Sequence, residues 1–84
     1  MTQDYEQLRL QLAENIRLIR RLKNLTQEQL ALMAEVDRTY VSQIERCTGN
    51  TSLLVLCKLA NILKITTDQL LTEPDILRNF LHVK

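Results

Sequence analysis

Glycine, proline and aromatic residues are scarce in this chain of 84 residues, which has one Gly, one Pro, two Tyr, one Phe and no Trp. Leucine, glutamate, glutamine, arginine and lysine are common instead, and such unbranched side chains lose little rotamer freedom in a helix. Hydrophobic residues make up 45% of the chain, enough for one small core but not for a second domain. We therefore expect one all-α domain over residues 1–84.

Long apolar runs are also missing. The run from Leu53 to Cys57 is far too short to cross a bilayer, and the first ten residues contain no apolar signal core. We expect a cytoplasmic protein with no membrane partner. The two cysteines, Cys47 and Cys57, match no metal-binding pattern, and free thiols are the default in a reducing compartment.

Signatures of catalysis are equally scarce. The one histidine, His82, lies in the tail, and the sequence contains neither an HExxH motif nor a glycine-rich phosphate loop. No nucleophile arrangement can be singled out. We expect no enzyme activity, no cofactor, no metal and no small-molecule ligand.

Excess charge of one sign is absent, because the net charge is +1. Residues 26–50, which carry the motif described below, hold two bases and four acids and are therefore locally negative. A purely electrostatic nucleic-acid binder should have a visibly basic contact surface. Any recognition by this segment must depend on well-placed hydrogen bonds.

Apolar spacing and helix-start residues predict five to six helices. Thr26 and Gln29 match a capping box, with Leu25 and Leu30 at the two staple positions. Other residues that can start helices are Asp37, Ser52, Thr66 with Gln69, and Pro74. The expected helices cover residues 5–23, 27–35, 37–46, 53–63, a segment that begins near 66, and 75–81.

The stretch DRTYVSQIER, residues 37–46, has an unusual pattern. Its two aliphatic residues, Val41 and Ile44, are three apart and so share one side of a helix. The opposite side carries hydrogen-bonding residues and no acid: Arg38, Thr39, Ser42, Gln43 and Arg46. Two short helices joined by a tight turn, the second with a polar outer face, indicate a helix-turn-helix over about residues 26–46.

The segment TQEQLALMAEVDRTYVSQIER resembles the helix-turn-helix of the Cro/CI-repressor (XRE) family of transcription regulators. Within that family, DRTY-V-S-Q-IER followed by a loop with Asn is similar to controller proteins of restriction-modification systems. The resemblance implies a compact lambda-repressor-like fold. It also implies a homodimer that binds a roughly palindromic operator in double-stranded DNA and controls a restriction-modification operon and its own promoter, with RNA polymerase as a further partner.

The resemblance also assigns roles to residues. Base reading falls to Arg38, Thr39 and Gln43, since Arg suits guanine, Gln suits adenine and a Thr methyl suits thymine. The DNA backbone is left to Gln27, Ser42, Arg46 and Asn50, with Tyr40 either packing beneath the helix or touching DNA. The alternative for the polar residues of this helix is an ordinary solvated face. The alternative for Arg46 is an ion pair with Glu45. Arg20 and Glu45 resemble the family's buried ion pair, which has a structural role.

Four positions depart from the family's pattern. Where the family usually has Gly, this chain has Asn24, Glu35, Cys47 and Lys64. A non-glycine residue at positive φ typically costs about 1 kcal/mol. The departure at Glu35 falls in the central turn of the motif, where it bears on the tilt of the reading helix.

The C-terminal segment, residues 64–84, is the expected dimerisation region, because one short reading helix covers only a few base pairs. The expected interface side chains are Ile65, Leu70, Leu71, Ile76, Leu77, Phe80 and Leu81. The alternative is that this tail folds back as core. Another hypothesis is a protein-interaction module, such as an antitoxin or adaptor. Four apolar residues that could be exposed would then form its binding patch: Leu18, Leu22, Leu54 and Val55.

Overall fold

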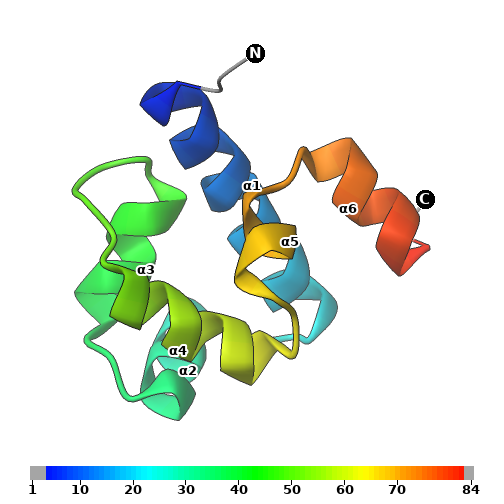
Figure 1. Cartoon of the computed structure of the whole chain (residues 1–84). Coiled ribbons are helices and arrows are strands. Elements are labelled where there is room, and N and C mark those ends of the chain that lie inside the picture. Colours follow the sequence, from blue (N-terminus) through cyan, green and yellow to red (C-terminus); the bar gives the residue numbers. More distant parts are fainter. Residues whose placement is uncertain (1–3, 83–84) are drawn as a thin grey trace.

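The computed structural model describes residues 4–82, which form six helices and no strand (Figure 1). The helices are α1 (Tyr5–Leu22), α2 (Gln27–Ala34), α3 (Arg38–Glu45), α4 (Leu53–Leu63), α5 (Thr67–Leu71) and α6 (Pro74–Leu81). The predicted all-α fold is confirmed. The ends of the predicted domain, residues 1–3 and 83–84, lie outside the described residues. None of these six helices has the length and apolarity needed to span a bilayer.

The first five helices begin at polar residues that cap them. In each case an extended residue accepts a hydrogen bond from a backbone N–H of the first turn; these residues are Asp4, Thr26, Asp37, Ser52 and Thr66. The predicted capping box of α2 is reciprocal. Gln29 N donates to Thr26 Oγ1 at 3.0 Å, and Thr26 N donates to Gln29 Oε1 at 2.8 Å. Local hydrogen bonding therefore determines where these helices start.

The four positions at which this chain lacks the family's Gly all adopt the left-handed conformation, with φ of 57° or 58° at Asn24, Glu35, Cys47 and Lys64. After each of them the next amide closes a hydrogen bond back across the helix end. At the central turn, for example, Val36 N donates to Ala31 O at 3.0 Å. The departures therefore strain the backbone without opening the turns, and the central turn is tight.

The core is built around α1, which packs against α3, α5 and α6, while α2 packs against α3 and α4. The most deeply buried apolar side chains come from all six helices: Ile16, Leu30, Val41, Leu59, Leu63, Leu70 and Leu77. Two buried polar side chains of α1 support α5. Asn15 Nδ2 donates to Leu70 O at 2.8 Å, and Gln11 Nε2 donates to Leu71 O at 2.7 Å. Because α5 has only five residues, these bonds satisfy carbonyls that its own helix cannot.

The prediction that Leu70 and Leu77 belong to a dimer interface is wrong. Their side chains are 0% and 1% exposed, because α5 and α6 fold back on α1 and bury them in the core of one chain. Ile76 and Phe80, on the other face of α6, are 54% and 61% exposed. The remaining members of the predicted set, Ile65, Leu71 and Leu81, are partly buried against the core.

Of the four apolar residues that could have been exposed, Val55 of α4 is buried in the core. Leu18 is partly buried against the same core. Leu22 and Leu54 are exposed, as expected. Two of the four apolar residues that could have formed an interaction patch are therefore largely used in folding.

Candidate nucleic-acid interface

Helix α3 is held in a defined orientation by its start and by its inner face. Asp37 Oδ1 accepts a hydrogen bond from Thr39 N at 2.8 Å, and this backbone bond holds the pKa of the Asp37 carboxyl below its usual value. Val41 and Ile44 are buried, so the helix packs on the core through them. The same contacts direct the opposite side of α3 outward.

That outward side is polar and carries no carboxylate. Arg38, Thr39 and Arg46 are exposed, Ser42 and Gln43 are partly buried, and Tyr40 is 45% exposed. The only acid within α3, Glu45, is buried and turned inward. One of the four acids in residues 26–50 is therefore hidden from a ligand, so the surface of this segment is less negative than its sequence.

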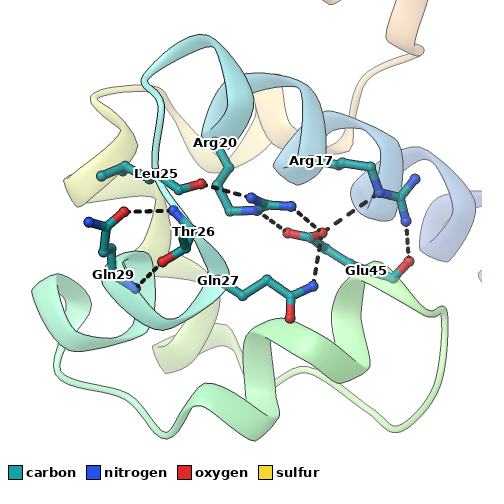
Figure 2. A network of polar contacts seen from close by, with 7 residues as sticks. All are labelled: Arg17, Arg20, Leu25, Thr26, Gln27, Gln29 and Glu45. Carbon is teal, nitrogen blue, oxygen red and sulfur yellow. Dashed lines mark hydrogen bonds and ion pairs between the residues drawn. The ribbon is translucent and has the colours of Figure 1, made fainter.

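Glu45 is the centre of a polar network that joins three helices (Figure 2). Arg20 Nε and Nη2, from α1, donate to Glu45 Oε2 and Oε1 at 2.7 and 2.9 Å, and Arg20 Nη1 donates to Leu25 O at 2.7 Å. Arg17 Nε lies 3.7 Å from Glu45 Oε1, and its Nη2 donates to the Glu45 carbonyl. The buried ion pair implied by the resemblance is present, with Arg17 as a second cation.

The network keeps the Glu45 carboxylate charged. Burial alone raises the pKa of Glu45, but hydrogen bonds from Arg20 and Gln27 and the charges of Arg20 and Arg17 outweigh burial and lower the pKa below 4.5. The same bond to Glu45 raises the pKa of Arg20. The pair is therefore a structural clamp between α1 and the end of α3.

Two predicted backbone-contact residues are engaged within the protein. Gln27 Nε2 donates to Glu45 Oε1 at 3.1 Å, so its amide joins the network at the start of α2. Asn50, in the loop after α3, accepts a hydrogen bond from the Tyr5 hydroxyl. Arg46 is exposed, and the alternative of an ion pair with Glu45 does not occur. Contact of these side chains with phosphate stays a prediction.

Sequence reasoning missed the residues of α1 that contact α3 and its loop: Tyr5, Arg9 and Arg17. These contacts join residues 28 to 45 positions apart in the chain. Of the three, only Arg17 carried a signal, since it lies one helical turn before Arg20 and so near the same side of α1.

The acidic, histidine and cysteine side chains of the described part of the chain do not gather into a cluster. Within residues 4–82 no group of three or more His, Cys, Asp or Glu side chains could hold a metal ion. Cys47 and Cys57 are free thiols.

The arrangement of α2, a tight left-handed turn and an outward polar α3 defines a helix-turn-helix module of the kind that places its second helix in the DNA major groove.

Comparison with known proteins also indicates a helix-turn-helix regulator. A family model described as helix-turn-helix matches residues 16–70, and the chain belongs to this family of XRE-type regulators. It is 44% identical over 62 residues to the control protein C.SmaI of Serratia marcescens, a match that covers 74% of each chain. The predicted resemblance to restriction-modification controller proteins is confirmed.

Solved structures are similar over nearly the whole chain. The hypothetical transcription factor NHTF from Neisseria superposes with a TM-score of 0.80 at 40% identity, covering 95% of this chain and 93% of that one. The restriction-modification controller protein C.Esp1396I, bound to a 19 base pair DNA duplex, has a TM-score of 0.69 at 30% identity. That match covers 88% of this chain and 95% of the other.

Proposed function

We propose that this protein is a sequence-specific transcription regulator that binds double-stranded DNA as a homodimer and controls a restriction-modification operon together with its own promoter. The whole chain acts as one helix-turn-helix domain. The observation that carries the proposal is the outward face of α3, with Arg38 exposed at its start and Arg46 just past its end. The carboxylate of Glu45 is clamped inside the protein, and that of Asp37 caps the helix. The DNA-bound state of the related C.Esp1396I supports the same class of partner.

In the proposed complex, the first turn of α3 reads bases. Arg38 and Thr39 are exposed at the N-terminal end of the helix, the end that usually meets base edges in the major groove. Gln43 follows one turn later and is partly buried beside the loop. Arg38 pairs with guanine, Gln43 with adenine, and the Thr39 methyl packs on a thymine methyl.

Backbone contacts fix the register of α3. Arg46 at the end of the helix supplies the charged contact, and Ser42, Asn50 and Gln27 supply neutral ones. The N-terminus of α2 presents backbone amides, which attract phosphate. Tyr40 reaches the backbone through its hydroxyl.

Two copies are needed because one α3 covers only a few base pairs. The proposed interface is centred on Ile76 and Phe80, the exposed apolar residues of α6. The partly buried residues Ile65, Leu71 and Leu81 contribute at its edge. A regulator bound beside a promoter acts on RNA polymerase, which is the proposed protein partner.

Selecting bound duplexes from a random DNA pool tests the function. The expected product is one enriched motif with approximate dyad symmetry, its two half-sites centred about 34 Å apart. Gel filtration with and without the selected duplex should then show the protein moving with DNA. An adaptor would enrich no motif and would ignore the duplex, and that result would reject the proposal.

A further inference from the structure

The loop between α3 and α4, residues 46–52, lies over a hollow instead of resting on the core. This hollow has a volume of about 170 Å³ and separates the loop from the first half of α1. Its lining includes Leu8 and Leu12 on α1 and Cys47, Gly49 and Thr51 on the loop. Side-chain packing beneath the loop is therefore incomplete, and polar contacts contribute to its position relative to α1.

Two side chains of α1 span this gap. Arg9 Nη2 donates to the Cys47 carbonyl, and the Tyr5 hydroxyl donates to Asn50 Oδ1. The Arg9 guanidinium also lies over the Tyr5 ring, 5.2 Å from its centroid, so the two residues support each other. We call Tyr5 and Arg9 the α1 brace. In Figure 1 the loop passes close to the first turns of α1.

The other side-chain contacts of the loop are weaker: Cys47 Sγ donates to the Arg9 carbonyl at 3.9 Å, and Thr48 Oγ1 donates to Gln43 O at 3.3 Å. Cys47 and Gly49 both have positive φ, and Thr48 N closes the end of α3 by donating to Gln43 O at 2.9 Å. Beyond that bond, in the described structure, Tyr5 makes the one recorded side-chain hydrogen bond from the body of the protein to residues 49–51. The position of Asn50 therefore depends on Tyr5.

We propose that Tyr5 and Arg9 are positioning residues for DNA binding. By holding Cys47 and Asn50 at a set distance from α1, they present the end of α3 and the following loop to the phosphate backbone. Neither residue needs to touch DNA for this role. The inference rests on the proposed function, since it assumes that Arg46 and Asn50 meet phosphates.

The brace can be tested first in the free protein, without DNA. Backbone amide exchange at Cys47 and Thr48, whose N–H groups donate to Ile44 O and Gln43 O, should become at least about tenfold faster in Arg9→Met and in Tyr5→Phe, while core amides keep their protection. Arg21→Met controls for the lost charge, since Arg21 is an exposed α1 arginine without an ion pair among residues 4–82. Glu6→Gln controls for the ion pair between Arg9 Nη1 and Glu6 Oε1 (3.1 Å), which Arg9→Met also removes. Unchanged loop exchange in both brace variants would overturn the proposal.

The DNA step is tested by a double-mutant cycle. Tyr5→Phe should weaken binding to the selected operator about three- to tenfold and leave the base preferences unchanged. In an Asn50→Ala background the same change should cost almost nothing, because its effect passes through Asn50. Equal losses in the two backgrounds would show that Tyr5 does not act through Asn50.

A loss of DNA affinity in Arg9→Met could also come from a direct contact between Arg9 and a phosphate. The variants Arg9→Gln and Arg9→Lys separate this explanation from positioning. A direct contact predicts that Lys retains most of the affinity and that Gln lowers the salt slope by about one. Positioning predicts that Gln and Met both lose affinity with an unchanged salt slope, because no phosphate contact is removed. If the wild type binds no duplex, the proposed function fails, and loop exchange still decides whether the brace exists.

Discussion

A single carboxylate, that of Glu45, connects the start of α2 and the end of α3 to α1. It receives two hydrogen bonds from Arg20 and one from Gln27 and lies near the charge of Arg17. A residue this well paired and this deeply buried stabilises the orientation of the reading helix without touching a ligand. This structural role differs from the base-reading role that we propose for Arg38.

Glu45→Ala should lower the free energy of unfolding by roughly 3 to 5 kcal/mol, because it leaves Arg20 buried without its partner. Urea unfolding of the wild type and the variant measures the change. Glu28→Ala is the control, since Glu28 is an exposed α2 acid. A melting temperature equal to that of the wild type would contradict the structural assignment.

The same residue predicts a pH dependence. The folded pKa of Glu45 is depressed below 4.5, so its contribution to stability is fully present above that pH. It is lost as the pH falls from 4.5 through the depressed folded value. Unfolding free energies of wild type and Glu45→Gln should therefore differ by a constant amount near neutral pH and converge in acid. If the difference in unfolding free energy grew as the pH fell, the pKa of Glu45 would be raised in the folded protein and not lowered.

Arg38→Ala should cost roughly 1 to 3 kcal/mol of binding energy per half-site and relax the preference at one base pair, expected to be G·C. Arginine forks onto guanine O6 and N7 in a way that lysine cannot. The variant is compared with the wild type on operators that carry each of the four base pairs at every half-site position. A uniform loss with unaltered preferences would make Arg38 a phosphate contact.

At the scale of the elements, most of the helix boundaries could be predicted because their causes are local. A helix cap at Thr26 or Asp37 depends only on a few neighbouring residues, and both caps are present in the structure. The contacts of Tyr5 and Arg9 could not be predicted, because they depend on how α1 packs beside a loop about forty residues away. Nothing in the local sequence indicates that placement.

The left-handed helix ends lead to a stability prediction. Lys64 has a φ of 58°, and replacing it with Gly removes the clash that Cβ makes in this conformation. After the entropy that Gly adds to the unfolded chain, Lys64→Gly should raise the free energy of unfolding by about 0.5 to 1 kcal/mol. Lys64→Ala keeps Cβ and should bring no such gain. Equal effects of Gly and Ala in thermal unfolding would argue against backbone strain at this position.

At the scale of the whole molecule, the sequence could not show which apolar faces the chain covers itself. The apolar residues of α5 and α6 were all candidates for an interface, but Leu70 and Leu77 lie in the core and Ile76 and Phe80 do not. Periodicity reveals an apolar stripe and does not say whether the same chain or another copy packs on it. The outward polar face of α3 was easier to predict, because the spacing of Val41 and Ile44 shows which side of the helix packs on the core.

The proposed dimer predicts that Phe80→Asp weakens self-association at least about tenfold while the chain stays folded, since Phe80 is 61% exposed. Sedimentation over a range of concentrations measures the dissociation constant. Leu54→Asp is the matched control, because it places the same charge on an exposed leucine of α4. A Phe80→Asp chain as dimeric as the wild type would exclude this side chain from the interface.

The central claim, that this protein reads a DNA sequence, is tested most directly by its affinity for the selected operator and for a duplex of the same composition in shuffled order. Both titrations are made at the same physiological salt concentration, since phosphate contacts alone depend strongly on salt. We expect two chains per operator and an affinity at least about a thousandfold higher than for the shuffled duplex. Equal affinities for the two duplexes would contradict it.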